Sequence, residues 1–170
     1  MKSFWAPWRM EYILRDKPDA SAPVTEGSPC VFCDLLQDAD GPGNLVLYRG
    51  EAAYVVMNKF PYSNGHLLVV PIRHEKNFES LSDIEGAEIF RLGQKCITVL
   101  RQTLKADGFN MGLNLGRAAG AGIAPHLHFH VVPRWENDHN FMAVLGDVRI
   151  IPEHIQTTYK NLKRTFSENL

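Results

Sequence analysis

Residues 125–133 read Pro-His-Leu-His-Phe-His-Val-Val-Pro, so that histidine alternates with an apolar residue three times. Successive side chains of a β-strand point to opposite faces, so the alternation predicts a strand with three imidazoles on one face and apolar groups on the other. The apolar face can pack against a helix. Packing alone explains the imidazoles poorly, because each buried ring needs hydrogen-bonding partners. The pattern predicts a functional site at His126, His128 and His130.

One metal ion cannot bind all three of these histidines. At about 3.3 Å per residue the outer two lie roughly 13 Å apart, whereas zinc–nitrogen bonds are about 2 Å long. Two neighbours could share an ion, which leaves open a zinc-dependent hydrolase with a catalytic metal on His126 and His128. In every case at least one of the three histidines is not a ligand of that ion and must have another role.

Charge and composition exclude several classes of protein. The 170 residues suit a single domain, and 18 basic against 19 acidic side chains give a net charge of −1. Surface recognition of nucleic acid is therefore not expected, although a pocket for one nucleotide stays possible. The longest apolar run, 67–72, is too short to cross a membrane, and residues 1–17 lack the apolar core of a signal peptide. The sequence predicts a cytoplasmic protein without membrane contact.

The periodicity of the chain predicts an α+β fold. Ser82 and Glu85 form a capping-box pattern at the start of a helical stretch that Asp107-Gly108 would end. One apolar face of this helix is predicted to carry Ile84, Ile89, Cys96, Leu100 and Leu104. The pattern favours a five-stranded antiparallel sheet with one long helix and a short C-terminal helix. The expected strands are 45–49, 52–57, 66–72, 110–115 and 126–132, and the expected helices are 82–106 and 152–164.

The motif His-Leu-His-Phe-His-Val-Val matches the histidine triad, and the chain resembles the histidine triad (HIT) family of nucleotide hydrolases and transferases. The resemblance covers roughly residues 30–142. Trp-Ala-Pro-Trp-Arg at 5–9, Pro-Arg-Trp at 133–135 and Asn-Phe-Met at 140–142 are similar to the prokaryotic branch that includes diadenosine tetraphosphate phosphorylases. The resemblance implies a HIT-like fold and a homodimer, with the long helix and the aromatic N-terminal segment as candidate interfaces.

Within this resemblance the chain divides into three parts. Residues 1–29 form an aromatic N-terminal segment and a linker rich in proline, serine and glycine. Residues 30–142 form the HIT domain, and residues 143–170 form a C-terminal extension.

The family implies a role for each histidine near the motif. His128 is expected to be the nucleophile that attacks the α-phosphorus of a nucleotide, giving a covalent nucleotidyl-histidine that water or inorganic phosphate then releases. A neutral imidazole can do this if its other nitrogen donates to a backbone carbonyl. His130 is expected to contact the same phosphate. His66 is expected to approach the catalytic centre.

Other residues are expected to bind the nucleotide. The resemblance assigns Asn114 to the phosphate and Asn58 to the ribose hydroxyls, although an Asx turn is an alternative role for Asn58. The glycine-bearing loop 116–122 leads to the histidine strand and can aim backbone N–H groups at a phosphate. Its expected nucleotide-binding residues are Gly120, Ala121 and Gly122. Many family members carry Ser or Thr where this loop has Gly122 and Ile123, a difference that weighs against phosphoramidase activity.

The spacing Cys30-x-x-Cys33 favours metal binding over a disulfide in a cytosolic chain. A zinc site needs two more ligands, and the resemblance supplies them at His74 and His126. The implied Cys₂His₂ zinc is structural and holds His126 beside the nucleophile. No organic cofactor is expected.

These observations favour an enzyme that cleaves dinucleoside polyphosphates, with phosphorolysis of diadenosine tetraphosphate to ATP and ADP as the preferred reaction. A hydrolase of the same substrates or of nucleoside phosphoramidates is the nearest alternative. The zinc-dependent hydrolase and a non-catalytic nucleotide-binding module are two further alternatives.

Overall fold

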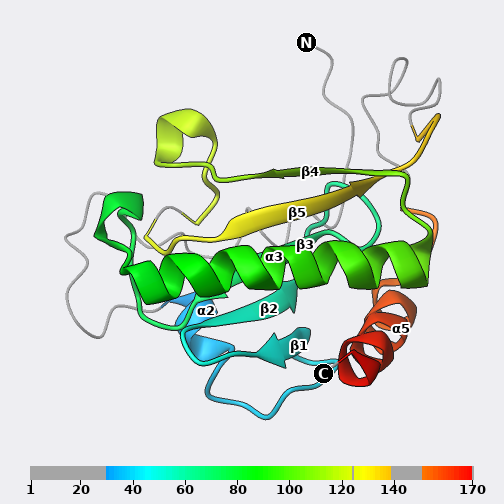
Figure 1. Cartoon of the computed structure of the whole chain (residues 1–170), viewed down its shortest axis with the longest axis horizontal. Helices are drawn as coiled ribbons and strands as arrows, with labels where there is room; N and C mark the ends of the chain where they lie inside the picture. Colours follow the sequence, from blue (N-terminus) through cyan, green and yellow to red (C-terminus); the bar gives the residue numbers. More distant parts are fainter. Residues whose placement is uncertain (1–29, 124, 139–150, 170) are drawn as a thin grey trace, which may run out of the picture.

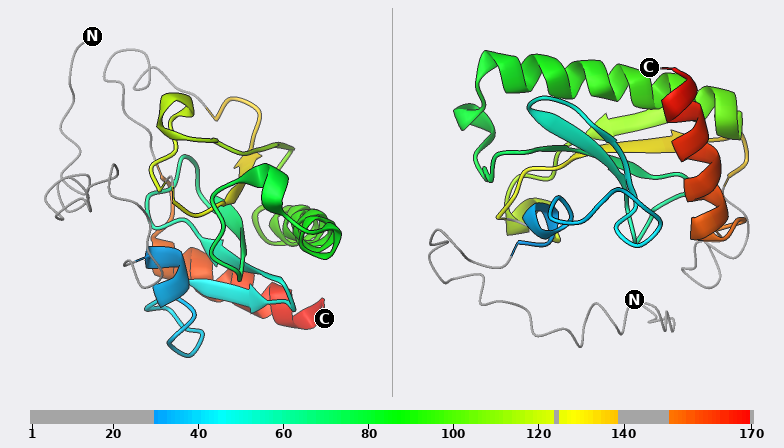
Figure 2. Two further views of the ribbon diagram at one scale, coloured as in Figure 1. Left: turned by 90° about the vertical axis from the view of Figure 1, so that its left-hand side faces the viewer. Right: turned by 90° about the horizontal axis from the view of Figure 1, so that it is seen from below.

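A computed structural model describes residues 30–123, 125–138 and 151–169 of the chain. Its sheet has five antiparallel strands in the order β1-β2-β3-β5-β4. Helix α3 lies along one face of this sheet, whereas the short helix α2 lies on the opposite side (Figures 1 and 2). The strands are β1 (Val46–Arg49), β2 (Ala53–Met57), β3 (Leu67–Pro71), β4 (Gly108–Gly112) and β5 (Phe129–Arg134), and the helices are α2 (Val31–Asp34), α3 (Asp83–Leu104) and α5 (Ile155–Glu168), with 3₁₀ turns η1 (Phe78–Ser80) and η2 (Arg117–Ala119). The predicted fold class is confirmed.

The centre of the sheet is apolar on both faces. Every residue of β2 and β3 is buried, which agrees with their near-continuous Val, Leu and Met content. The side chains of α3 that cover one face include Ile89, Cys96 and Leu100, all less than 10% exposed. Helix α3 therefore covers one face of the central strands, and the apolar core continues to Phe32 and to the α5 residues Tyr159, Leu162 and Phe166.

Helix α3 begins where the sequence predicts. The Ser82 hydroxyl accepts from the Glu85 N–H while the Glu85 carboxylate accepts from the Ser82 N–H, so the capping box forms. The helix ends earlier than predicted, at Leu104, because Lys105 adopts a left-handed conformation with φ of 53°. The Asp107-Gly108 pair does not end the helix but leads into β4.

The prediction that Ile84 lies on the apolar face of this helix is wrong. Ile84 is 71% exposed, whereas Ile89 is 8% exposed. Five residues of α-helix rotate the side chain by about 140°, so these two positions cannot share a face.

The histidine strand also begins later than predicted. Strand β5 starts at Phe129, so His126 and His128 precede it. The pairing of β3 with β5 stops at Val69 and Phe129, although β3 itself continues to Pro71. Beyond that pair the chain turns away, and the Leu127 N–H donates to the Glu75 carbonyl over 2.7 Å instead.

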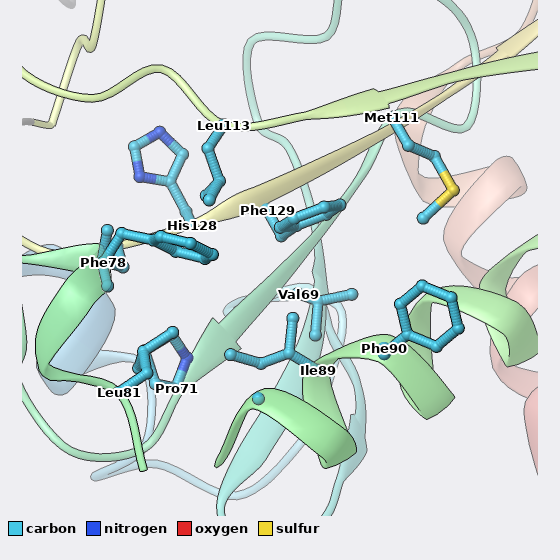
Figure 3. Close-up of a pocket in the computed structure, with 12 residues that line it drawn as sticks. Val69, Pro71, Phe78, Leu81, Ile89, Phe90, Met111, Leu113, His128 and Phe129 are labelled. Atoms are coloured by element: carbon cyan, nitrogen blue, oxygen red, sulfur yellow. The ribbon is translucent and has the colours of Figure 1, made fainter. Parts of the chain in front are cut away.

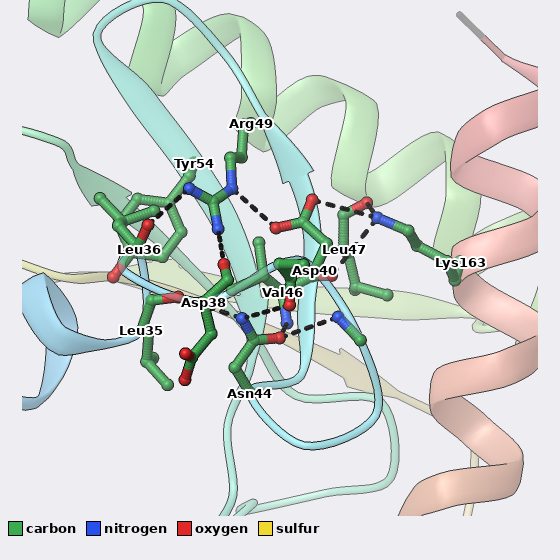
Figure 4. Close-up of polar contacts among 12 residues, drawn as sticks. Leu35, Leu36, Asp38, Asp40, Asn44, Val46, Leu47, Arg49, Tyr54 and Lys163 are labelled. Carbon is green, nitrogen blue, oxygen red and sulfur yellow. Dashed lines mark hydrogen bonds and ion pairs between the residues drawn. The ribbon is translucent and has the colours of Figure 1, made fainter.

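The outer edge of β1 is covered by α5 and by the loop before β1 (Figure 4). Lys163 of α5 donates to the carbonyls of Leu47 (2.9 Å) and Val46 (3.4 Å), and the Tyr159 hydroxyl donates to the Val46 carbonyl over 3.1 Å. Asp40 pairs with both Lys163 (3.3 Å) and Arg49 (2.7 Å). These contacts satisfy backbone groups that an edge strand otherwise leaves open.

The hairpin between β1 and β2 is held from α3. The Glu88 carboxylate accepts from the backbone N–H groups of Glu51, Ala52 and Ala53. A Cβ on Gly50 would overlap the Glu88 carboxylate, so this turn requires glycine. The helix therefore fixes both the central strands and the end of the first hairpin.

No helix in the described ranges is long and apolar enough to cross a membrane.

Candidate functional site

The three histidines of the motif are buried close to one another, on the side of the sheet opposite α3. Their exposed fractions are 1% for His126, 7% for His128 and 8% for His130. The rings of His128 and His130 have centroids 5.0 Å apart. Leu127 and Phe129 line an apolar groove beside α3, and His128 between them also contributes to its lining.

Backbone carbonyls fix the tautomers of two of these histidines. Nδ1 of His128 lies 2.9 Å from the His126 carbonyl oxygen, which can only accept, so Nδ1 carries the proton. The lone pair of neutral His128 is therefore on Nε2. Nε2 of His126 lies 3.0 Å from the Pro71 carbonyl oxygen, so in His126 the lone pair is on Nδ1 instead.

Burial keeps the three imidazoles neutral near pH 7. Desolvation lowers the pKa of His126 and of His130 to about 4, and it lowers the pKa of His128 as well. The positive charge that a protonated His128 would carry lowers the pKa of His130 further. A neutral imidazole with a free lone pair is the form that a nucleophile requires.

His66 belongs to the same cluster. It is fully buried, and its Nε2 lies 2.9 Å from Nδ1 of His130. The Tyr62 ring covers both imidazoles, with centroids 4.7 Å from His66 and 5.7 Å from His130. The structure thus brings together His66, His128 and His130, the three predicted catalytic residues.

The predicted phosphate-binding groups differ in how the structure places them. Nδ2 of Asn114 lies 3.5 Å from Nε2 of His130, so the two side chains face one another. In the loop after Asn114, Gly116 and Gly120 have φ of 75° and 87°. The Ala121 N–H donates to the Gly116 carbonyl over 3.2 Å, so in this conformation it is already bonded within the loop. Asn114 is better placed beside His130 than the Ala121 N–H is for binding an anion.

Asn58 forms the Asx turn that the sequence analysis gave as the alternative to ribose binding. Its Oδ1 accepts from the Phe60 N–H over 2.9 Å, which is an Asx turn, and its Nδ2 lies 3.2 Å from Nδ1 of His66. Both ends of the amide therefore have partners within the protein. Asn58 is half-exposed at the edge of the histidine cluster, so its amide can also reach solvent-side groups.

The four predicted metal ligands converge. One ligand atom from each of Cys30, Cys33, His74 and His126 lies within 4.8 Å of all the others. The Cys30 Sγ to His126 Nδ1 and Cys33 Sγ to His74 Nδ1 distances are both 3.3 Å, and Cys33 Sγ to His126 Nδ1 is 3.6 Å. Tetrahedral zinc with ordinary bond lengths places sulfur and nitrogen ligands about 3.5 Å apart.

The chemistry of this cluster also suits a dication. His126 aims its Nδ1 lone pair at the sulfurs because its Nε2 donates to Pro71, the outer-shell contact typical of metal-binding histidines. Burial and the neighbouring Cys30 raise the pKa of Cys33 to about 11. A cation bound between the two sulfurs would favour the thiolate form of Cys33 and offset this shift. The residues present fit a Cys₂His₂ zinc site.

Two aromatic side chains belong to the site although the sequence analysis did not single them out. Phe32 has ring centroids 5.1 Å from His128 and 5.6 Å from His126, and it is only 3% exposed. Tyr62 covers His66 and His130. A signal existed for Phe32, because it lies between the two cysteines. Tyr62 lies in a turn, where an aromatic residue is commonly a surface group.

The sequence matches the HIT domain family over residues 43–137. The chain belongs to the HIT domain family. Its fold and its cluster of buried histidines are those of a histidine triad protein, as the resemblance implied.

Similar proteins extend the likeness beyond the domain. The AP-4-A phosphorylase of Mycobacterium tuberculosis strain ATCC 25618 / H37Rv is 42% identical over 163 residues, which are 95% of this chain and 83% of that protein. A Zn-bound histidine triad family protein from Mycobacterium smegmatis has a similar structure, with a TM-score of 0.66, 28% identity, and coverage of 82% of this chain and 94% of that one. A hypothetical histidine triad nucleotide-binding protein from Sulfolobus tokodaii strain7 has a TM-score of 0.64 and 28% identity over 82% of this chain and 90% of that one.

Proposed function

We propose that this protein is a nucleotidyl transferase that cleaves dinucleoside polyphosphates, and that its preferred reaction is phosphorolysis of diadenosine tetraphosphate to ATP and ADP. The observation that carries the proposal is the bond between His128 Nδ1 and the His126 carbonyl, which leaves a neutral, nucleophilic Nε2 beside His130. The substrate comes from the M. tuberculosis relative, whose name is AP-4-A phosphorylase.

The chain is a HIT-type enzyme, because it belongs to the family and is 42% identical over 95% of its length to a relative named as a phosphorylase.

In the proposed reaction His128 Nε2 attacks the α-phosphorus of diadenosine tetraphosphate. The bond from that phosphorus to the bridging oxygen breaks, ATP leaves, and AMP stays bound to His128. The imidazole becomes cationic in this step, and the His126 carbonyl stabilises the charge through the Nδ1–H. An oxygen of inorganic phosphate then attacks the same phosphorus, which releases ADP and restores neutral His128. Water as the acceptor would give AMP instead.

His130 and Asn114 would hold the phosphate group during both attacks. Their Nε2 and Nδ2 atoms lie 3.5 Å apart, close enough for both to donate to one anionic oxygen. Asn58, at the edge of the histidine cluster, would bond the ribose hydroxyls.

We further propose structural zinc at Cys30, Cys33, His74 and His126. When bound, zinc would supply a rigid crosslink between α2, the segment after β3 and the histidine motif. The residue that connects this crosslink to the chemistry is His126, since its side chain is a ligand and its carbonyl orients His128. The three free thiols suit the reducing cytoplasm in which we place the enzyme.

The proposed functional unit is a homodimer. Among the described residues, no segment pairs with the outer edge of β4. Beside this strand an apolar groove of about 310 Å³ runs between α3 and the sheet, and Phe90, Met111 and Phe129 face it (Figure 3). Phe90 is 66% and Met111 is 40% exposed. Two copies of an antiparallel edge strand can pair about a two-fold axis and cover such a surface.

A product assay tests the reaction. The protein is incubated with diadenosine tetraphosphate with and without inorganic phosphate, and the nucleotides are separated by ion-exchange chromatography. ATP and ADP formed only with phosphate are expected. ATP and AMP without phosphate would mean a hydrolase, and no turnover under either condition would reject this substrate.

Replacing the nucleophile tests the mechanism. His128→Ala and His128→Gly are expected to reduce turnover by at least about a thousandfold, because no other side chain can form the covalent bond. Thermal unfolding serves as the control for folding. A variant that folds normally and keeps near-wild-type rates would disprove the assignment, and tight nucleotide binding without product in either protein would indicate a binding module.

Elemental analysis of protein purified without an affinity tag tests the metal. About one zinc per chain is expected, and Cys33→Ser should lose it together with thermal stability. Turnover should continue after brief treatment with a chelator that leaves the zinc in place. Complete absence of zinc would reject the site, and immediate loss of activity on chelation would favour a catalytic metal.

A further inference from the structure

Among the described residues, no backbone carbonyl fixes the tautomer of His130, in contrast to His126 and His128. Its Nδ1 faces Nε2 of His66 over 2.9 Å, and at most one of these two nitrogens carries a proton when both rings are neutral. Which nitrogen of His130 presents a proton to the phosphate site therefore depends on His66.

The tautomer of His66 is fixed by the turn that precedes it. The Tyr62 backbone N–H donates to Nδ1 of His66 over 3.1 Å, and a peptide nitrogen can only donate. The Asn58 amide points the same way, because its Oδ1 accepts from Phe60 and its Nδ2 faces His66. His66 therefore carries its proton on Nε2 and donates it to His130 Nδ1. As a result, neutral His130 must carry its own proton on Nε2. That atom and the Asn114 Nδ2, 3.5 Å away, are then two donors that do not bond one another, and an anionic oxygen beside them would accept from both.

The position of that turn depends on two helices. A Cβ on Gly65, whose φ is 71°, would overlap a methyl group of Leu104 in α3, so the turn lies directly against the end of this helix. On its other side, the Asn64 side chain lies 3.0 Å from the Thr158 hydroxyl in α5. Asn64 is 8% exposed and Thr158 is fully buried. This contact is therefore shielded from water.

The Thr158 hydroxyl also lies 2.6 Å from the Glu153 carboxylate. A hydroxyl has one proton, so it satisfies an ionised Glu153 and Asn64 together by donating to the carboxylate and accepting from the amide. The Asn64 amide then turns its NH₂ group toward Thr158, an assignment that rests on the hydrogen-bond network because oxygen and nitrogen of an amide are interchangeable in shape. The Asn64 amide thus donates to the Thr158 hydroxyl oxygen, whose orientation is fixed by the bond to Glu153.

We infer that Thr158 of α5 is a positioning residue for the catalytic site. It holds Asn64 and the turn 61–65, whose Tyr62 N–H sets the proton on His66 and, through His66, makes Nε2 of His130 a fixed donor toward the phosphate. Helix α5 lies outside the residues that match the HIT domain, so this support comes from the C-terminal part of the chain. The inference rests on the proposed function for the role of His130 in turnover, but not for its tautomer.

The test compares three variants of the full chain. Thr158→Val removes the hydroxyl with little change of shape, and Thr158→Ser restores it. Thr165→Val is the matched control, because Thr165 is a second buried threonine of α5 whose hydroxyl bonds Thr103 in α3 and not the turn. The measurements are kcat and KM for diadenosine tetraphosphate, the thermal unfolding temperature, and the nitrogen resonances of His130 in ¹⁵N-histidine-labelled protein without substrate.

Thr158→Val is expected to lower kcat about tenfold with KM changed less than about twofold, because the donor is misplaced where charge develops. Thr158→Ser should recover most of kcat. Thr165→Val should lose a similar amount of stability and keep kcat. The wild-type His130 resonances should report a proton on Nε2, and Thr158→Val should show a mixture of tautomers.

Three results would overturn the inference: wild-type kcat in folded Thr158→Val, an equal loss of kcat in Thr165→Val, or a proton on Nδ1 of His130 in the wild-type protein. If Thr158→Val does not fold, Thr158→Ala replaces it with the same expectations. A wild-type protein that does not cleave the substrate would defeat the proposed function alone, since the histidine resonances still decide the tautomer.

Discussion

The two edges of the sheet differ in how their backbone groups are treated. At β1 the outer carbonyls of Val46 and Leu47 accept from Tyr159 and Lys163 of α5. At β4 the described residues offer no such partner on the outer side, and Met111 of this strand is 40% exposed. The same sheet thus has one closed edge and one open edge.

The difference indicates what each edge is for. Exposed edge strands promote unwanted pairing, so proteins commonly cover them with helices, loops and charged groups. Arg49, Asp40 and Lys163 place such charges at β1. The apolar groove and Phe90 lie beside β4 instead, which favours association there. This contrast supports β4 and α3 as the surface of the proposed homodimer.

The largest expected effect is at the open edge. Phe90→Asp introduces a charge into a surface that the dimer would bury, and we expect the dimer to weaken by about a hundredfold or more, because aromatic anchors dominate interface energies. Folding should change little, since Phe90 is 66% exposed in the single chain. Sedimentation equilibrium measures the dissociation constant.

Lys160→Glu, an exposed change on α5, is the control for Phe90→Asp and should leave the dimer intact. A wild-type protein that is monomeric at micromolar concentration would contradict the proposal that the open edge is a dimer interface. Unchanged association of Phe90→Asp would move the interface elsewhere.

A smaller effect is expected at the closed edge. Lys163→Met removes the donor to Leu47 and Val46 and the ion pair with Asp40, and we expect the free energy of unfolding to fall by about 1 kcal/mol. Urea unfolding measures the change. Lys160→Met, on the same helix, should be nearly neutral, and equal losses in the two variants would mean that the edge contacts contribute nothing specific.

The smallest effect concerns the start of α3, the helix that lies over the sheet between the two edges. Hydrogen bonds from Arg73, and then from Ser82, lower the pKa of Glu85 to about 2. A folded-state pKa below the unfolded value means that the carboxylate stabilises the protein above about pH 4.5 and loses this effect as pH falls through about 2. Arg73 is half-exposed, so we expect no more than about 1 kcal/mol.

Glu85→Gln lacks this ionised group at every pH. The difference in unfolding free energy between wild type and Glu85→Gln should therefore shrink between about pH 5 and pH 2. Urea unfolding over this range measures it, with Asp83→Asn in the same turn as the control. A difference that stays constant or grows on acidification would contradict the assignment.

Local patterns predicted much of this molecule because they are properties of neighbouring residues. Alternation identified the three histidines, and Ser82 with Glu85 identified the start of α3. The spacing of Cys30 and Cys33 predicted two of the four metal ligands, and only the family resemblance supplied His74. These features need no knowledge of which distant segments meet.

The rest depends on contacts between remote segments. The late start of β5 follows from where its pairing with β3 stops, and the exposure of Ile84 follows from which side of α3 meets the sheet. Asn64 and Thr158 are 94 residues apart, and no periodicity relates them. Sequence patterns cannot predict such pairs, because they arise only after the helices and strands pack.

The two elements that form the closed edge, β1 and α5, are synthesised at different times. Tyr159 bonds a carbonyl 113 residues earlier in the chain. Translation at about 5–20 residues per second leaves roughly 6–23 s between the synthesis of β1 and that of the helix that covers it. Until α5 is made, a nascent chain leaves the outer edge of β1 open to its neighbours on the polysome. The binding of a chaperone to β1 would then matter most for this protein in the seconds before α5 leaves the ribosome.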